Sequence, residues 1–533
     1  MADLPPYPPI DPTTFDLIIV GTGLSQSILG AAAASAGKSV LHLDPNPFYG
    51  SHSSSIPPTG FSSFLCPPEL STGDRLLTHR SVYSDVDIVP EACPEDSRKF
   101  ILDVSGPRVL FCADKAIEII LRSGVNQYLE FKAIDELLIW DEGKLESVPD
   151  TRSKIFKDKK MRLQEKNLLM TFFKLVQQHA QEEKKISNDD LQRPFVDFLT
   201  ESRLPERIKK IILYAIAMVD YDQDEKKFCK HILSTKDGIE RLVLYNSSVS
   251  RFSNAPGAMI YPIYGQGELP QAFCRRAAVK GCIHVLRMPI IDLHVDESGQ
   301  YRGVKLASDQ DIYSDRLVLD PSYKIPSDMK KSNPRDSLSD HPENPNLTDS
   351  YTKVARAVCI TGTSLRPDVS NVLVIFPPQS LFPQQATAVR ALQIGGNMAI
   401  CPPGMFVLYL SALCSEAVQG KESLQEAINA LVNLGSDNTE TSGSISDSTS
   451  DAKNAGARPV IWKAFYVQEL VEGHYDAICS APTPDGRLDY DNVILATIQL
   501  FENLYPEEKF FPETPAEDSD EDADANVNLE PES

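Results

Sequence analysis

Apolar runs separated by turn residues open the chain and predict its first folding unit. Residues 15–20 (FDLIIV) form a β-branched apolar run that leads into the turn GTGLSQS, and small residues follow at 28–36. The next apolar run, 39–43 (SVLHL), ends at Asp44. A strand, a glycine turn, a helix and a second strand in this order are typical of a βαβ unit. We therefore expect an α/β fold with a doubly wound sheet of the FAD/NAD type.

A helical pattern follows in the next part of the chain. Apolar residues recur there at three- and four-residue spacing, which predicts helices over 114–123, 163–178, 188–200 and 205–219. Between the first two of these helices, residues 128–148 have the apolar content of strands that return to the sheet. Further strands are predicted at 282–286, 290–295, 317–319, 357–360, 372–376, 391–394 and 405–410. The second, smaller domain is therefore expected to be mostly helical.

These patterns suggest a division of the chain into four parts. Residues 1–106 would begin the sheet domain, 107–225 would form the helical domain, and 226–512 would complete the sheet domain. Residues 327–350 and 435–456 resemble insertions that are too polar to offset the entropy of ordering, so we expect them to be disordered. The acidic segment 513–533 would be a disordered tail.

Composition and charge narrow the possible functions. The chain has 533 residues, of which 42% are hydrophobic and 24% are charged, as in ordinary globular proteins. Eleven of the acidic residues and one Lys fall in residues 507–533, and the remaining residues share a surplus of −13 out of the total −23. This balance argues against nucleic-acid binding. Apolar runs are too short to span a bilayer and no signal peptide opens the chain, so we expect an intracellular protein.

The glycine turn matches a dinucleotide fingerprint only in part. Gly21 and Gly23 occupy the first two glycine positions, and Asp44 stands where an acidic residue would bind a ribose hydroxyl. Gln26 replaces the third glycine, and its long side chain would crowd both the packing of helix on strand and the approach of a pyrophosphate. The fold is thus better supported than a bound cofactor.

Other motifs give no catalytic or metal site. The acidic run at 220–225 (DYDQDE) lacks the Gly and Glu that an EF-hand loop needs, and the ten Cys match no common zinc spacing. No nucleophile motif is present. The segment 261–276 (YPIYGQGELPQAFCRR) contains Tyr and Arg, which are frequent in protein interfaces. On these residues alone, however, a turn leading into a solvated helix is the favoured interpretation.

Two segments resemble the family of Rab GDP dissociation inhibitors and Rab escort proteins. They are residues 15–50, which end in DPNPFYG, and residues 261–281, which contain YGQGELPQAFCRR. The resemblance implies that the dinucleotide fold persists without flavin or any other cofactor, and that the surface around both segments binds GDP-bound Rab GTPases. It assigns this contact to Tyr49, Arg98, Glu268, Gln271 and Arg275. Family members often have Arg where this chain has Pro45, so the resemblance assigns no contact to that position.

The escort branch of the family is indicated by residues 148–173. In that branch an aromatic matching Phe156 docks into the α-subunit of the Rab geranylgeranyltransferase heterodimer; an alternative is that Phe156 is ordinary core. A second docking position, usually Arg, is Asn167 here, which removes a bidentate ion pair. The PPYPPIDP extension, the insertions and the tail also fit this longer branch.

The resemblance implies a non-catalytic escort of Rab proteins. The chain would present unprenylated Rab to the transferase, hold the geranylgeranyl lipid afterwards, and contact membranes transiently while residing in the cytosol. We expect the lipid cleft on the helical domain, where the apolar residues are Leu163, Leu168, Leu169, Phe172 and Phe173, although the same residues could be core. Two alternatives remain: a recycling Rab GDP dissociation inhibitor and a flavin-dependent oxidase.

Overall fold

The computed structural model describes most of the chain. It covers residues 9–67, 77–94, 96–183, 185–224, 231–324, 352–433, 460–476 and 478–512. The two segments that we expected to be disordered, 327–350 and 435–456, and the acidic tail lie outside the described residues. Among the described helices, none is both long and apolar enough to cross a bilayer.

The first eight-stranded sheet contains the predicted βαβ unit. β1 pairs in parallel with β2 on one side and β15 on the other, as the alternation of strand and helix predicts. In spatial order its main strands are β12 (Ile283–Leu286), β2 (Val40–Asp44), β1 (Thr14–Val20), β15 (Asp311–Leu319), β14 (Tyr301–Leu306) and β13 (Ile290–Val295). β23 (Ile478–Ser480) also pairs with β15, and β22 (His474–Tyr475) pairs with β23.

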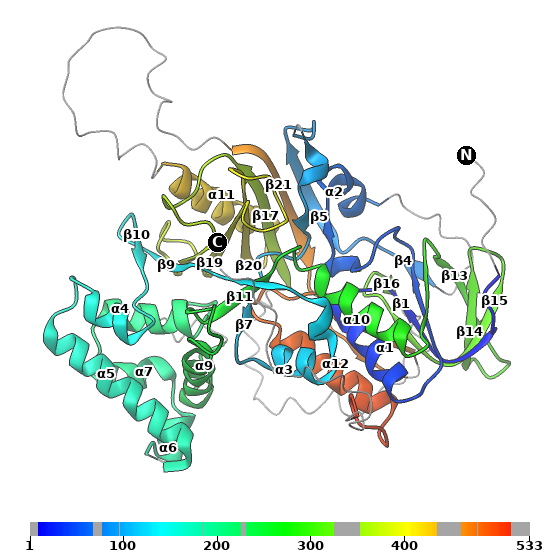
Figure 1. Cartoon of the computed structure of the whole chain (residues 1–533), viewed down its shortest axis with the longest axis horizontal. Coiled ribbons are helices and arrows are strands. Elements are labelled where there is room, and N and C mark those ends of the chain that lie inside the picture. Colours follow the sequence, from blue (N-terminus) through cyan, green and yellow to red (C-terminus); the bar gives the residue numbers. More distant parts are fainter. Residues whose placement is uncertain are drawn as a thin grey trace, which may run out of the picture.

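Three helices pack together in the core beside this sheet. α1 contacts both α10 and α12, and Figure 1 shows the three helices close together, to the left of β14 and β15. Their bounds are α1 (Leu24–Ser35), α10 (Glu268–Val279) and α12 (Asp491–Leu504). α1 is made mostly of small residues and is almost wholly buried, which lets α10 approach it closely. α3 (Lys115–Arg122) contacts α12 and adds its apolar residues to the same core.

A second eight-stranded sheet lies between the first sheet and a group of helices (Figure 1). In spatial order its strands are β10 (Lys144–Ser147), β9 (Glu136–Asp141), β18 (Val372–Phe376), β19 (Val389–Gly395), β20 (Phe406–Cys414), β17 (Lys353–Thr361), β21 (Val460–Glu469) and β5 (Tyr83–Val89). β18 and β19 are buried along their whole length, which explains the unbroken apolar sequence of β18. α11 (Ala417–Asn433) covers β17, β20 and β21 on one face.

The helical group lies at one end of the molecule. It contains α4 (Arg152–Lys157), α5 (Leu163–Gln178), η4 (His179–Glu183), α6 (Asn188–Gln192), α7 (Phe195–Glu201), α8 (Glu206–Lys210), the π-helix η5 (Ile211–Ile216) and α9 (Thr235–Ser248). The helix predicted over 163–178 is confirmed with the same bounds. The single helix predicted over 188–200 is wrong, because Pro194 ends α6 and caps α7. α9 contacts α5, α6 and α7, so the helices that pack together extend to Ser248.

Short elements complete the fold. β7 (Leu110–Phe111), β11 (Met259–Pro262) and β8 (Phe131–Ala133) form a small sheet. β3 (Ser55–Ile56) pairs with β6 (Leu102–Asp103), and β4 (Thr78–His79) pairs with β16 (Tyr323–Lys324). The remaining elements are α2 (Pro58–Leu65) and the 3₁₀ turns η1 (Ser51–Ser53), η2 (Ser97–Lys99) and η3 (Val125–Tyr128).

Candidate functional site

The turn between β1 and α1 has the backbone of a dinucleotide site, but its acidic residue is already occupied. Asp44 is fully buried at the end of β2. One carboxylate oxygen accepts hydrogen bonds from Thr22 N at 2.7 Å and from Ser51 Oγ at 2.8 Å. The other accepts bonds from the backbone and side-chain amides of Asn46 at 2.8 and 2.9 Å. Protein donors thus satisfy the carboxylate that would otherwise bind a ribose hydroxyl.

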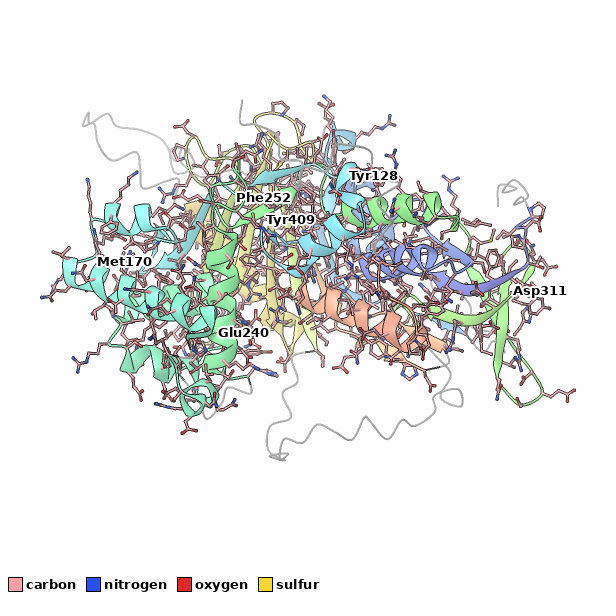
Figure 2. All side chains as sticks on the ribbon, turned by 60° about the horizontal axis from the view of Figure 1, so that its bottom comes forward. Tyr128, Met170, Glu240, Phe252, Asp311 and Tyr409 are labelled. Atoms are coloured by element: carbon pink, nitrogen blue, oxygen red, sulfur yellow. The ribbon has the colours of Figure 1, made fainter. Side chains whose placement is uncertain are left out.

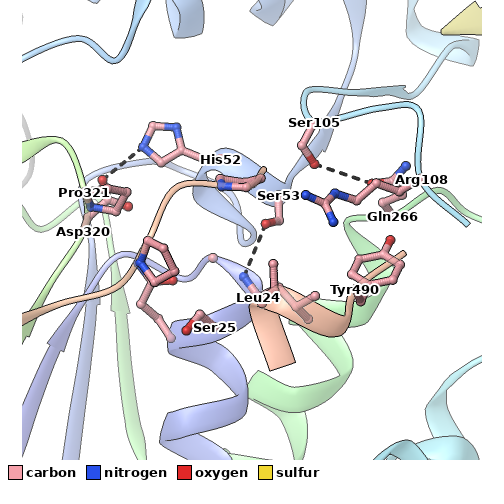
Figure 3. A pocket seen from close by; sticks show the side chains of 15 residues that line it. Leu24, Ser25, His52, Ser53, Ser105, Arg108, Gln266, Asp320, Pro321 and Tyr490 are labelled. Carbon is pink, nitrogen blue, oxygen red and sulfur yellow. Dashed lines mark hydrogen bonds and ion pairs between the residues drawn. The ribbon is translucent and has the colours of Figure 1, made fainter. Parts of the chain in front are cut away.

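The space beside the turn is too small for a dinucleotide. Its cavity measures about 20 Å³, whereas ligand sites are commonly about 300–1,000 Å³. Figure 3 shows Leu24, Asp320 and Tyr490 closing around it. Asp320 lies so close to Gly21 that a Cβ there would meet its Oδ2 at 2.6 Å. Oε1 of Gln26 lies equally near Gly23, where it would meet a Cβ at 2.7 Å. The residues present therefore do not fit FAD or NAD.

Three of the predicted Rab-binding residues share one face of α10. Glu268, Gln271 and Arg275 are spaced by three and four residues, which places them on the same side of a helix. Gln271 and Arg275 are exposed, and Glu268 is half-buried at the start of the helix. The Arg275 guanidinium lies over the Tyr128 ring, 4.3 Å from its centroid. Tyr128 is labelled in Figure 2, and its ring holds the flexible Arg275 side chain against the surface.

Glu268 differs electrostatically from an ordinary surface carboxylate. Burial raises its pKa to about 7, and the nearby Glu130 adds to this effect. A long hydrogen bond of 3.4 Å, donated by Tyr264 N to Oε2 of Glu268, acts in the opposite direction. A carboxyl group with this pKa is partly protonated at neutral pH, so an incoming cation would favour its ionised form.

Tyr49 and Arg98 lie outside α10. Tyr49 is half-buried after β2, and its ring meets the ring of His284 edge-on with centroids 6.0 Å apart. Arg98 is exposed on η2, a turn that packs against α2. The structure therefore joins three of the five predicted contacts on one helix and places the other two on separate loops.

The turn before α10 is fixed by buried residues that sequence reasoning missed. Asp103 is fully buried, and its Oδ1 accepts hydrogen bonds from Gln266 N at 3.0 Å and from Ser55 Oγ at 2.5 Å. Its other oxygen accepts a bond from the Tyr261 hydroxyl. Gly267 N donates to Ser55 Oγ at 2.7 Å. The two glycines of GQG were the sequence signal for this turn, because a glycine is needed where the backbone approaches β3 closely.

Phe156 is not part of the core. Its side chain is 62% exposed on the short helix α4. Thr151 caps this helix by accepting a hydrogen bond from Lys154 N at 3.2 Å, and Lys166 Nζ donates to the Phe156 carbonyl at 2.8 Å. Leu163 and Leu168 on α5 are also exposed, by 72% and 38%. Large apolar side chains exposed on neighbouring helices are typical of an interaction surface.

A cavity of about 620 Å³ lies within the helical group, between α5 and α9. Of the five residues expected at a lipid cleft, Phe173 lines it. Leu169 and Phe172 are buried in the adjoining core, and Leu163 and Leu168 lie on the surface. Figure 2 shows Met170, another lining residue, on the helices at the left. The other lining residues are Asp150, Ile155, Asn167, Thr171, Lys174, Gln177, Gln178, Gln181, Ile216, Leu242, Tyr245 and Asn246.

Sequence comparison finds relatives along nearly the whole chain. A model of the family described as GDP dissociation inhibitor matches residues 11–456. Rab escort protein 1 of Arabidopsis thaliana is 48% identical, and the match covers 99% of this chain and 100% of the relative. The Rab proteins geranylgeranyltransferase component A of Drosophila melanogaster is 25% identical, with 95% and 91% covered.

Comparison with solved structures confirms the expected FAD/NAD-type α/β fold. The Rab GDI of Plasmodium falciparum superposes with a TM-score of 0.67 at 20% identity, covering 93% of this chain and 99% of its own. An oxidoreductase from Methanosarcina mazei superposes with a TM-score of 0.51 at 11% identity, covering 91% and 99%. Because the family model matches residues 11–456 and a relative is 48% identical over nearly the whole chain, this chain belongs to the GDP dissociation inhibitor family.

Proposed function

We propose that this chain is a Rab escort protein, the accessory component of a Rab geranylgeranyltransferase complex. The full-length 48% identity to a Rab escort protein supports this reading, and the observation that carries it within the structure is the exposed Phe156. Geranylgeranyl transfer itself would occur on the transferase. In this role the protein works in the cytosol, where it binds unprenylated Rab in the GDP form, and meets membranes only when it delivers the lipidated product.

The α10 surface would bind the folded part of the Rab protein. Arg275 is already held over Tyr128, so forming an ion pair with a Rab carboxylate loses less side-chain entropy than for a free Arg. Glu268 would become ionised when a Rab cation approaches it. Tyr49 offers a flat amphipathic contact, and the exposed Arg98 adds a second cation.

Phe156 would anchor the transferase. An aromatic side chain that fills a partner pocket at an interface centre can contribute about 2 kcal/mol or more. In the free protein Phe156 already faces solvent, so docking removes exposed apolar surface without unfolding the core. Asn167 cannot form the two parallel ionic hydrogen bonds that Arg would form, so we expect Phe156 to carry most of the contact energy.

The cavity between α5 and α9 would hold a geranylgeranyl chain. Its volume of about 620 Å³ lies in the range of sites that bind small molecules. Burying one such chain contributes on the order of 15 kcal/mol, at about 0.8 kcal/mol per carbon. Phe173, Leu242 and Ile216 supply apolar lining, and Lys174 and the Gln side chains mark the polar rim.

The test is geranylgeranyl transfer to an unprenylated Rab by purified transferase, measured with labelled lipid diphosphate in the presence and absence of this chain. Wild-type protein should stimulate transfer, and Phe156→Ala should lower stimulation at least about tenfold at limiting protein concentration. Val418→Ala is the matched control, because Val418 is 77% exposed on α11, outside the helical group. Equal stimulation by Phe156→Ala would remove the docking role.

A recycling Rab GDP dissociation inhibitor is the second candidate, favoured by the superposition on a Rab GDI. The same assay separates the two functions. A chain that slows GDP release from prenylated Rab without stimulating transfer would be a recycling inhibitor. The flavin-dependent oxidase is not supported. Asp44 already accepts hydrogen bonds from the protein, and the side chains of Gln26 and Asp320 occupy the space beside the glycine turn.

A further inference from the structure

Three metal-ligating side chains meet in the interior behind Tyr49. They are His42 on β2, Cys274 on α10 and His284 on β12. One ligand atom from each lies within 4.8 Å of the others. His42 and Cys274 are buried, and His284 is half-buried. The two imidazole rings are tilted by 36°, with centroids 5.0 Å apart.

The hydrogen bonds of His42 fix its tautomer. Nε2 lies 2.7 Å from the Gly21 carbonyl, and a carbonyl only accepts, so Nε2 carries the proton. In a neutral ring with its proton on Nε2, Nδ1 carries a free lone pair. Nδ1 is buried and has no hydrogen-bond partner among the described residues. A ring that donates one N–H to a backbone carbonyl and leaves the other nitrogen unpaired is oriented as metal-ligating histidines are.

Cys274 and His284 complete the group of three ligands. Cys274 Sγ contacts Ser27 Oγ at 3.2 Å. Cys282 lies beside the group, with Sγ 3.9 Å from Nε2 of His284. Of the three ligands, His284 is the one that is partly exposed to solvent.

We propose that His42, Cys274 and His284 bind one Zn²⁺ ion between β2, β12 and α10. Two imidazoles and a thiolate are the ligand set that suits Zn²⁺ rather than Mg²⁺ or Ca²⁺. Zinc bonds of about 2.0–2.3 Å require the three ligand atoms to approach to somewhat less than 4.8 Å, which small side-chain rotations supply. Binding replaces the Cys274 thiol proton, which leaves to solvent, with a zinc–sulfur bond.

The site has a physical connection to the α10 surface. Zinc would tie β2 and β12 to α10, the helix that carries Glu268, Gln271 and Arg275. It would also immobilise the His284 ring against which Tyr49 packs. Spacing along the sequence did not predict the site, because the ligands come from positions 42, 274 and 284 and meet only in the folded sheet.

Metal binding to the purified full-length protein tests this inference. After removal of metal with a chelator, Co²⁺ should bind with a thiolate-to-cobalt charge-transfer band in the near ultraviolet, and one equivalent of Zn²⁺ should abolish that band. Cys274→Ser and His284→Gln should each weaken Zn²⁺ binding at least tenfold. Cys359→Ser should bind normally, because Cys359 is equally buried but lies in β17 of the other sheet.

Two results would overturn the proposal. One is that the wild-type protein shows no charge-transfer band with Co²⁺ and also retains less than a tenth of an equivalent of Zn²⁺. The other is unchanged Zn²⁺ affinity in both variants. His284→Gln keeps the experiment decisive if Cys274→Ser does not fold, because His284 is half-buried and its replacement leaves α10 intact. Circular dichroism spectra of each variant verify folding.

Discussion

Single side chains tune the proposed Rab surface through their surroundings. Glu268 and Arg275 both lie on α10, but they differ in how much water reaches them. Arg275 is exposed, and its guanidinium lies over the Tyr128 ring. Glu268 is half-buried, so its charge depends on pH near neutrality. The two charges of the surface should therefore respond differently to solution conditions.

Rab affinity should depend on pH through Glu268. Its pKa of about 7 means that the carboxylate needed for an ion pair is scarce at pH 6 and predominant at pH 8. If only the ionised form binds, affinity for a GDP-form Rab should rise about tenfold over this interval. Titration calorimetry in buffers of different ionisation heats measures both affinity and proton release. Glu268→Gln should bind weakly and without this pH dependence; a persistent slope in that variant would assign the effect to another group.

At the scale of elements, close backbone approaches position the binding helix. α10 begins at Glu268 directly after a turn that lies against β3. A Cβ on Gly267 would come within 2.5 Å of the Ser55 backbone nitrogen, so the turn depends on the missing side chain. This contact fixes where α10 begins, and the packing of α10 against α1 holds the rest of the helix.

Gly267→Ala should therefore disturb the Rab surface. We expect it to lower the free energy of unfolding by about 1–3 kcal/mol, because the backbone must shift to relieve the overlap. Rab affinity should fall at least tenfold. Gly60→Ala is the matched control, because a Cβ there has no neighbour within 4 Å and Ala favours the helix α2. Chemical denaturation measures the stability and a Rab-binding assay measures the affinity. Normal Rab binding by Gly267→Ala would show that the turn does not position the Rab-binding residues of α10.

Some side chains of α5 line the cavity and others lie on the surface, so substitutions on this helix can test where the lipid binds. Met170 lines the cavity, whereas Leu168 is exposed on the same helix. Met170→Trp should fill part of the cavity and weaken binding of prenylated Rab at least tenfold, without changing affinity for unprenylated Rab. Leu168→Trp adds the same bulk outside the cavity and should leave both affinities unchanged. If Met170→Trp binds prenylated Rab as tightly as the wild-type protein does, the lipid binds elsewhere.

At the scale of the whole molecule, buried polar residues hold distant segments together. Arg356 on β17 is almost fully buried and donates hydrogen bonds to the carbonyls of Ser105 at 2.8 Å, Gly106 at 3.0 Å and Asp485 at 2.7 Å. Its Nε donates to Gln468 at 2.8 Å. Burial lowers the pKa of Arg356 to about 10, which still leaves it charged at neutral pH. Arg356 therefore connects β17 of the second sheet to the chain at Ser105 and Gly106 and to the chain at Asp485.

Replacing Arg356 should destabilise the whole protein. Arg356→Leu leaves the carbonyls of Ser105 and Gly106 and Oε1 of Gln468 without their donor. Each buried unpaired group costs about 1–3 kcal/mol, so the free energy of unfolding should fall by about 3 kcal/mol or more. Arg302→Leu removes an exposed ion pair with Asp296 and should change stability by less than about 1 kcal/mol. Urea denaturation measures both; similar stabilities of the two variants would contradict the connecting role.

Local sequence determined the type and position of many elements. The βαβ unit, the helix at Leu163–Gln178 and the strand at Val372–Phe376 follow from apolar spacing and glycine turns, which act between near neighbours. The residues Glu268, Gln271 and Arg275 could be placed on one face because helical periodicity is also local. The Phe156 position was identifiable from its segment, but the segment alone did not say whether the side chain was core or surface.

Only the tertiary structure decided which residues meet across the fold. It exposed Phe156, separated the cavity-lining Phe173 from Leu169 and Phe172, and brought Asp103 to the turn before α10. It also placed His42 beside Cys274 and His284. Such contacts depend on strand order and on the close packing of α10 against α1, which are set by burial over the whole chain rather than by neighbouring residues.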